Sequence, residues 1–392
     1  MFDIQNTLPQ IWSDVKQRLF PSKQNATTPL DQVSRFYQSD FYRSLDENIK
    51  STFYDGPLGG LDSRIHPRSD KTFLHDCIRL WQNGRNVSCA IYGEKGTGLS
   101  TLLNVLGEEI KKQAIDHKLI SLNQRLTSEA DVIETLCRAL AIDSFDFKLD
   151  TFIQKMHKKP PCVILIDNLH FLVQRTLNAQ TVIDALSSIV LATRGHHLWI
   201  IASEEQAWRR LCYGYQFEHL FSHTHYIENY SDSEIRNLLV KRFSYAGIHH
   251  VNDIPIEKLQ DEKSPVSDIA KRSKGCIELA IFYCLNNLTY GLTPKSLYIT
   301  SPLEIDTTPL KTLSQMERFT LSEICAHGVI SAREHQTIFR ISLNESKMTL
   351  ERLRVLGILE KDESANHADT YCLKLIISSV VIRYLISMNY LY

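Results

Sequence analysis

Residues 93–100 read Gly-Glu-Lys-Gly-Thr-Gly-Leu-Ser and constrain the fold more than any other part of the chain. They match the phosphate-binding pattern G-x-x-x-x-G-K-[ST] at every fixed position but one, because Leu99 stands where the lysine belongs. An apolar run over residues 88–92 precedes them, and an amphipathic run begins at Thr101. A phosphate-binding loop requires a strand, a glycine loop and a helix in this order, so the segment predicts a P-loop in an α/β fold.

Each fixed residue of this loop has a physical role. The glycines let the backbone curl so that several N–H groups point at one phosphate cluster, and the following helix adds its N-terminal dipole. Ser100 is the expected magnesium ligand, whereas Leu99 cannot supply the charge that lysine brings to the outer phosphates. We therefore expect weakened binding of ATP or ADP with Mg²⁺ by a set of loop residues: Gly93, Glu94, Lys95, Gly96, Thr97, Gly98, Leu99, Ser100 and Thr101.

A second motif lies at residues 162–168, which read Cys-Val-Ile-Leu-Ile-Asp-Asn. A continuous apolar run that ends in an acid is typical of a buried parallel strand that presents a carboxylate at its C-terminal end. Asp167 is the expected partner of Ser100 in holding magnesium. Asn168 follows, where hydrolysing P-loop proteins commonly carry glutamate, and an amide can orient water but cannot take its proton.

With these two motifs, the chain resembles the AAA+ family of P-loop ATPases. Residues 197–203 resemble the next core strand of that family, which places Ser203 at the sensor-1 position. The resemblance implies that Asp167, Asn168 and Ser203 occupy the catalytic positions around the phosphates. It also implies that the active sites form between neighbouring subunits, so we expect a homo- or hetero-oligomer with other AAA+ subunits.

Several positive charges that the family directs at phosphates are missing or displaced. Thr224 stands where the arginine finger is often found, although Arg209 and Arg210 are close in sequence. Glu278 stands where the sensor-2 helix would carry its arginine, and a carboxylate there would repel phosphates. An arginine finger alone contributes a factor of about 10³–10⁵ to the rate of hydrolysis, so several such losses predict weak or absent hydrolysis.

Lys95 offers one way to restore a positive charge to the loop, since it lies shortly before Leu99 in sequence. Some deviant P-loops carry an additional lysine near the start of the loop. We favour the simpler interpretation that Lys95 is a solvated loop charge.

The alternation of predicted helices and strands indicates a parallel sheet flanked by helices, with phosphate sites at the carboxyl ends of its strands. The fold class is therefore an α/β P-loop NTPase sheet with a helical lid, followed by a winged-helix domain. Ile65 is a candidate adenine contact. The predicted parts are an N-terminal extension at 1–60, an αβα core at 61–225, a helical lid at 226–295, a linker at 296–308 and a winged helix at 309–392.

Two regions leave alternatives open. The N-terminal extension could be an arm that docks on a neighbour or a local extension packed on its own core. In the predicted winged helix, the third helix carries Lys347, Arg352 and Arg354, which would suit a DNA backbone, but the predicted wing at residues 362–369 is acidic. We favour a protein partner over DNA for this domain.

Composition narrows the class of protein. The 392 residues carry a net charge of -1, which gives no overall attraction to nucleic acid, and the nine cysteines form no C-x-x-C pair. Neither a signal pattern nor an apolar span of membrane length is evident, so we expect a cytoplasmic protein without a membrane partner.

Three functional hypotheses follow. The leading one is a degenerate AAA+ subunit, a pseudo-ATPase that senses nucleotide or acts as a scaffold in a multi-subunit complex. The second is an active ATP-dependent switch on DNA with an atypical P-loop, and the third is an interaction module without nucleotide. Core, lid and winged helix in this order resemble the origin-recognition initiators and bacterial signalling ATPases.

Overall fold

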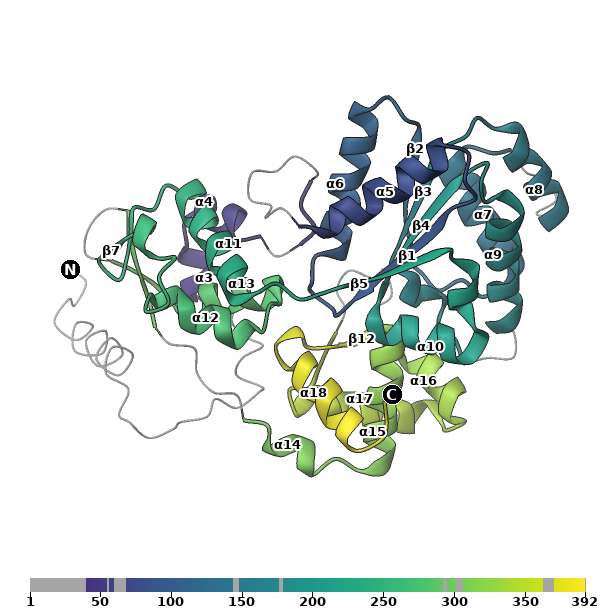
Figure 1. The fold of residues 1–392 in the computed structure, drawn as a ribbon. Helices are drawn as coiled ribbons and strands as arrows, with labels where there is room; N and C mark the ends of the chain where they lie inside the picture. Colours follow the sequence, from purple (N-terminus) through teal and green to yellow (C-terminus); the bar gives the residue numbers. More distant parts are fainter. Residues whose placement is uncertain are drawn as a thin grey trace, which may run out of the picture.

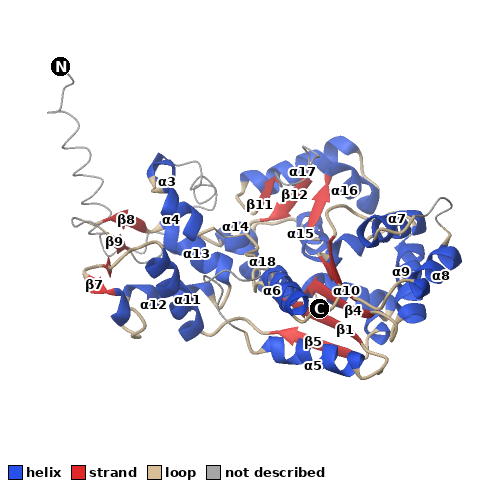
Figure 2. Cartoon of the chain, turned by 90° about the horizontal axis from the view of Figure 1, so that it is seen from above, coloured by secondary structure: helices blue, strands red, loops and turns tan. Residues whose placement is uncertain are grey.

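The computed structural model describes residues 40–54, 56–59, 68–143, 148–175, 179–291, 295–300, 306–361 and 370–391. These residues form three lobes (Figures 1 and 2). We call them the core lobe (68–227), the lid lobe (40–54 and 228–300) and the C-terminal lobe (306–391). The C-terminal lobe contacts both of the others. Its helix α15 (Gln315–His327) packs on α10 (Glu205–Tyr215) of the core, and its helix α18 (Leu375–Ser387) packs on α13 (Ile277–Asn286) of the lid.

The core lobe contains a five-stranded parallel sheet in the order β2-β3-β4-β1-β5, which confirms the predicted α/β class. Its strands are β1 (Ser88–Gly93), β2 (His117–Ser121), β3 (Val163–Asp167), β4 (Leu198–Glu204) and β5 (His223–Ile227). The strand that begins the P-loop lies beside β4, with Tyr92 in register with Ser203. Parallel pairing therefore brings the carboxyl ends of β1, β3 and β4 to one edge of the sheet.

Helices cover both faces of this sheet, since the central strands are apolar on both sides. Leu165 of β3 faces α5 and α6, whereas its neighbours Ile164 and Ile166 face the opposite layer of helices. One layer is α5 (Asp70–Gln82) and α6 (Leu99–Lys112), and the other is α7 (Glu129–Leu140), α8 (Leu149–Lys158) and α9 (Ala179–Thr193).

Two further elements of the core lobe contact α15 of the C-terminal lobe: η2 (Leu169–Leu172), which follows β3, and α10 (Glu205–Tyr215), which follows β4. The next element, η3 (Phe217–Leu220), lies at the amino end of β1, where the Ser88 hydroxyl donates to the Leu220 carbonyl. Trp208 of α10 stacks on Tyr92 of β1 with ring centroids 5.3 Å apart. The chain therefore continues from β3 and from β4 directly into an element that contacts the C-terminal lobe.

The lid lobe contains more than the predicted helices. Its helical elements are α11 (Asp232–Tyr245), η4 (Ile256–Lys258), α12 (Pro265–Ser273) and α13 (Ile277–Asn286). A four-stranded sheet joins β6 (His250–Val251), β7 (Ile254–Pro255), β8 (Leu288–Tyr290) and β9 (Ser296–Ile299). The strand β9 lies in the segment that the sequence assigned to a linker, because strands this short show too few residues for a period of two.

The described part of the N-terminal extension packs on its own chain. It forms α3 (Asp40–Ser44) and α4 (Glu47–Thr52), which lie beside the lid in Figure 1. Leu45, Ile49 and Phe53 are buried in the apolar core of the lid, and the ring centroids of Phe53 and Phe243 lie 5.1 Å apart. Of the two alternatives for this region, residues 42–54 show the second, because they pack on the lid of their own chain. Residues 1–39 lie outside the described part.

The C-terminal lobe has helices and a small antiparallel sheet compatible with a winged helix. Its helices are α14 (Thr308–Lys311), α15 (Gln315–His327), α16 (Ala332–Phe339), α17 (Leu343–Val355) and α18 (Leu375–Ser387), and its strands are β10 (Val329–Ser331), β11 (Leu359–Lys361) and β12 (Thr370–Leu373). Capping boxes at Ser314, Ser331 and Ser342 start three of the helices. The strand β10 was not predicted, and the predicted wing at residues 362–369 lies outside the described residues.

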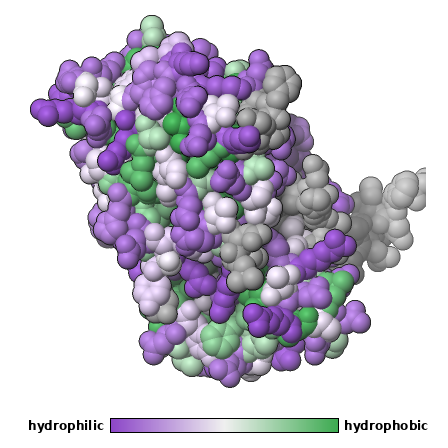
Figure 3. All heavy atoms as spheres, turned by 90° about the vertical axis from the view of Figure 1, so that its right-hand side faces the viewer, coloured by the Kyte–Doolittle hydropathy of each residue, from purple (hydrophilic) through white to green (hydrophobic). Residues whose placement is uncertain are grey.

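Polar residues dominate the face on the right of Figure 1, and apolar residues interrupt it in patches (Figure 3). Within the described part of the chain, no helix combines the length and the apolar character needed to span a membrane.

Candidate functional site

The predicted nucleotide residues surround a cavity of about 230 Å³ at the carboxyl edge of the core sheet. Glu94 to Thr101 of the loop, Asp167, Asn168 and Ser203 all line it. Gly93 is the predicted loop residue that does not line the cavity, because it is the last residue of β1 and lies beneath the loop.

The backbone of the loop has the geometry of a phosphate cradle. Gly96 and Gly98 adopt φ angles of 82° and 88°, in the left-handed region that favours glycine. Thr97 stabilises the turn because its hydroxyl donates to the Glu94 carbonyl at 2.9 Å. Gly98 is the N-cap of α6, so the helix dipole points its positive end into the cavity.

Ser100 and Asp167 are brought together as the magnesium prediction requires. The Ser100 side chain hydrogen-bonds to the Asp167 carboxyl, which also accepts the Asn168 backbone N–H at 2.8 Å. Burial raises the pKa of Asp167, and Glu204 adds to the rise. A carboxylate and a hydroxyl are suitable ligands for Mg²⁺, which keeps most of its other positions for water and phosphate.

Asn168 has a structural contact that limits its chemistry. It adopts the left-handed backbone conformation with φ 62°, and its side-chain amide donates to the Leu122 carbonyl at the end of β2, at 3.1 Å. The amide is thus held toward β2 while the residue lines the cavity. Ser203 is buried, and its hydroxyl donates to the Glu204 carbonyl at 3.1 Å.

Leu99, at the lysine position, is the first residue of α6. Its half-buried side chain packs against the apolar layer between α5, α6 and the sheet, while the residue also lines the cavity. The position therefore provides an apolar surface where the family provides an ammonium group.

Lys95 lies in a different environment from the solvated one that the sequence favoured. It is half-buried and lines the cavity. Burial by itself lowers the pKa of its ammonium group, but electrostatic attraction to Glu204, Cys372, Glu278 and Glu360 raises the pKa above its usual value. Lys95 is therefore charged.

The lid contacts the tip of the loop directly. The Ile277 backbone N–H donates to the Gly96 carbonyl at 3.2 Å, and the Cys276 thiol lies 3.7 Å from the same oxygen. A Cβ atom on Gly96 would lie 3.4 Å from a carboxyl oxygen of Glu278. The residue at the sensor-2 position therefore presents a negative charge beside the phosphate cradle.

Sequence reasoning missed three basic residues that line this cavity. Arg68 donates to the carbonyl of Thr97 at 2.8 Å and to that of Glu228, and it forms an ion pair with Asp70. The other two are Lys71, paired with Glu109 at 2.7 Å, and Arg242, which donates to the carbonyls of Thr52 and Tyr54. Each is engaged by protein groups far away in sequence, so no local motif marks it.

Apolar side chains in the lining of the cavity suit a nucleobase. They include Leu58, Val105 and Leu238, and the Arg68 guanidinium lies 4.1 Å above the centre of the Tyr230 ring. The segment that carries Leu58 is fastened to α6, since the Leu58 N–H donates to the Thr101 hydroxyl at 3.3 Å. The predicted adenine contact Ile65 lies outside the described residues.

The candidates for an arginine finger lie apart from this cavity. Thr224 is exposed on the edge strand β5. Arg209 pairs with Glu205 on the same helix at 2.6 Å, and Arg210 pairs with Glu323 of the C-terminal lobe at 3.2 Å. Within the described ranges, no group of three or more His, Cys, Asp or Glu side chains could hold a metal ion by itself.

Comparison with known proteins gives one sequence match. Residues 83–211 match the family model described as "AAA domain". No curated protein sequence matches the chain.

Several solved structures show low structural similarity to this chain. The ORC2 protein of Aeropyrum pernix (ADPNP-ADP complexes) has a TM-score of 0.47 and 14% identity, covering 87% of this chain and 98% of that one. The ORC1 protein of the same organism, in complex with DNA, has a TM-score of 0.47 and 11% identity, covering 88% of this chain and 98% of that one. The RuvB Holliday junction branch migration motor of Thermotoga maritima has a TM-score of 0.40 and 14% identity, covering 83% of this chain and 97% of that one.

The matched segment contains the loop, the strand that ends in Asp167, and the strand that ends beside Ser203. The chain therefore contains an AAA domain at residues 83–211.

Proposed function

We propose that this protein is an AAA+ subunit that binds ATP or ADP with Mg²⁺ weakly, hydrolyses it slowly or not at all, and acts as a nucleotide-sensing or scaffolding component of a multi-subunit complex. The observation that carries the proposal is Leu99. It occupies the first turn of α6 beside the phosphate cradle, and its side chain packs into the apolar layer of the core.

Retained binding is supported by the parts of the site that need no lysine. The positive φ angles of Gly96 and Gly98 suit a loop whose N–H groups converge on a phosphate group. Ser100 and Asp167 suit a magnesium ion, and the apolar lining residues of the cavity suit a base. Mg²⁺ would neutralise phosphate charge at this position, and the protein groups would orient the phosphate chain.

Slow hydrolysis is supported by the charges around the cradle. Leu99 removes one positive contact, Glu278 brings a negative one to the loop, and Asn168 cannot accept a proton from water. Arg68 and Lys71 line the cavity but are bound to protein acceptors. Since one lost cation can cost about 10³–10⁵ in rate, the combined effect places turnover far below that of an intact site.

A protein partner is supported by the surface of α17. Arg352 pairs with Glu317 at 3.0 Å, and Arg354 pairs with Glu351 at 2.7 Å, so acids partly neutralise the basic residues that would face DNA. Met348 and Val355 on the same helix are 73% and 68% exposed, which suits an apolar contact with protein.

Titration with fluorescent ADP and ATP in the presence of Mg²⁺, combined with a phosphate-release assay, tests the proposal. We expect measurable binding that Asp167→Ala weakens, and phosphate release close to background. Leu99→Lys should tighten binding, whereas the uncharged control Leu99→Met should not. Turnover by the wild type at rates typical of the family, abolished by Asp167→Ala, would instead favour the active switch. Absence of binding would favour the interaction module.

A further inference from the structure

Four acidic side chains line the phosphate cavity, namely Glu94, Asp167, Glu204 and Glu278. For two of them the structure shows a local role. Asp167 and Ser100 suit a magnesium ion, and Glu94 accepts a hydrogen bond from the Asn229 side-chain amide at 2.9 Å. Glu204 and Glu278 have no such role, and they bring negative charge to a cavity whose loop backbone suits phosphate groups.

Glu204 lies beside the loop at the carboxyl edge of the sheet. It is the last residue of β4 and is in register with Gly93, the last residue of β1. Its position is also the N-cap of α10, but its side chain makes no capping hydrogen bond there. The carboxylate therefore has no part in starting the helix, and it lies one residue beyond Ser203 at the edge where a parallel sheet binds phosphates.

Glu278 reaches the same loop from the lid. It belongs to the first turn of α13, and the Ile277 N–H beside it donates to the Gly96 carbonyl at 3.2 Å. A Cβ atom on Gly96 would lie 3.4 Å from a carboxyl oxygen of Glu278. An acid in this turn complements the helix dipole, but that role does not require a place beside the glycine loop. Acids from the core and from the lid thus both border the phosphate cradle.

The cavity offers few positive charges to the outer phosphates of a nucleotide. In P-loops, backbone N–H groups hold the α- and β-phosphates and the lysine reaches the β- and γ-phosphates, but here Leu99 replaces that lysine. Arg68 and Lys71 form ion pairs with acids of α5 and α6, and Arg242 donates to two carbonyls. Among the described lining residues, Lys95 is thus the cation left to oppose the two glutamates. The third phosphate of ATP therefore adds more repulsion than attraction.

We propose that this site selects a nucleoside diphosphate, ADP, over ATP, because Glu204 and Glu278 repel the third phosphate and Leu99 cannot attract it. This inference rests on the proposed function, since it names the nucleotide that the same site prefers. At an effective dielectric constant of about 20, the repulsion between one added phosphate charge and a nearby carboxylate is large enough to change affinity about tenfold.

The test measures dissociation constants of the full-length chain by titration calorimetry in the presence of Mg²⁺. The two ligands are ADP and the β,γ-imido analogue of ATP, which resists hydrolysis, and the quantity compared is the ratio of the analogue's dissociation constant to that of ADP. The variants are Glu204→Gln, Glu278→Gln and Leu99→Lys. Glu262→Gln is the matched control, because it removes the same charge from an exposed position on the lid.

We expect the wild type to bind ADP about tenfold more tightly than the analogue. Each glutamine substitution should lower this ratio about threefold, mainly by tightening binding of the analogue. Leu99→Lys should lower the ratio as well, because a lysine at this position reaches the outer phosphates. Glu262→Gln should keep the ratio of the wild type.

A wild type that binds the analogue as tightly as ADP would overturn the selectivity while leaving the proposed nucleotide binding intact. So would a ratio that stays unchanged in both glutamine variants. If the wild type binds neither ligand, the proposed function and the selectivity both fail. The two glutamates lie in different lobes, so either variant keeps the test valid if the other does not fold.

Discussion

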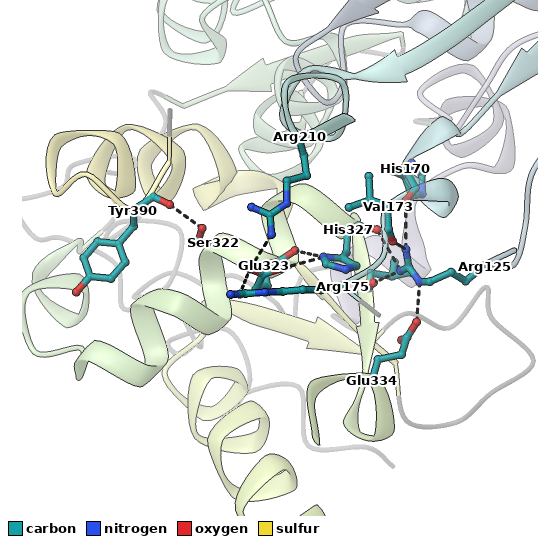
Figure 4. Close-up of polar contacts among 11 residues, drawn as sticks. Arg125, His170, Val173, Arg175, Arg210, Ser322, Glu323, His327, Glu334 and Tyr390 are labelled. Atoms are coloured by element: carbon teal, nitrogen blue, oxygen red, sulfur yellow. Dashed lines mark hydrogen bonds and ion pairs between the residues drawn. The ribbon is translucent and has the colours of Figure 1, made fainter. Parts of the chain in front are cut away.

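Replacing Arg125 by alanine should release the C-terminal lobe from the core without unfolding either. In the structure, the guanidinium connects two carbonyls of the core with Val329 and Glu334 of the C-terminal lobe (Figure 4). Removal of this group leaves the Glu334 carboxylate without its cation and several carbonyl groups without a donor. The substitution therefore acts at the boundary between lobes and leaves the apolar core of each in place.

The magnitude follows from the burial of the pair. Breaking a buried ion pair by removing one partner costs about 3–5 kcal/mol, whereas a surface pair contributes about 0–1 kcal/mol. The side chain of Arg125 is 11% exposed but that of Glu334 is 32% exposed, so water can reach the orphaned carboxylate. We therefore expect a loss of about 2–3 kcal/mol in the free energy that holds the lobe in place.

Native-state hydrogen exchange at low urea concentrations measures this free energy separately for each lobe, which whole-chain unfolding of a protein with several lobes would not. Residues 329–331 of β10 are the reporter. The matched control is Arg138→Ala, since Arg138 pairs with Glu134 at 2.7 Å on an exposed face of α7. A change below about 0.5 kcal/mol for Arg125→Ala, or an equal change for Arg138→Ala, would refute the reasoning.

Acid should imitate the loss of Arg125. Burial raises the pKa of Glu334, but the Arg125 guanidinium and the hydrogen bonds from Ser331 outweigh this and hold the pKa below 4.5. The pair thus contributes fully well above pH 4.5 and is lost as the pH falls through the lowered pKa. Docking measured by the same exchange reporter should weaken in that range, and Glu334→Gln should remove this part of the pH dependence.

Three further predictions concern the C-terminal lobe, the P-loop and the lid. Burial lowers the pKa of His327 to about 3 and that of His335 to about 4, so the C-terminal lobe should lose stability as the pH falls from about 6.5, where only the unfolded chain takes up protons. In urea titrations at several pH values, His335→Gln should flatten this dependence, and an unchanged slope would contradict it. Gly96→Ala should weaken ADP binding, because a Cβ there would lie 2.5 Å from the Cys276 sulfur and φ is positive, whereas Gly59→Ala has no atom within 4 Å and should bind like the wild type. Phe53→Ala should destabilise the lid by about 3–5 kcal/mol in urea unfolding, since its buried ring fills the lid core, and a loss below about 1 kcal/mol would contradict that packing.

Local patterns predicted the core elements with good boundaries. The strands predicted over residues 88–92, 162–168 and 197–203 correspond to β1, β3 and β4, because each is a continuous apolar run. A helix start also has a local signature where a serine is followed three residues later by an acid, as in the capping box of Ser231 and Glu234. The short strands β6 to β10 were missed, because a few residues of pairing depend on a distant partner strand rather than on their own pattern.

The sequence by itself determined the frame of this protein: a P-loop with leucine at its lysine position, an acid at the end of the next motif, and the α/β class. These features are local, because glycine conformations, apolar runs and caps depend on neighbouring residues. Only the tertiary structure decided that Glu278 of the lid lies beside Gly96 of the P-loop, and that Arg125 reaches Glu334 across 209 residues of sequence. Such pairings arise from how the lobes pack together, which no local pattern encodes.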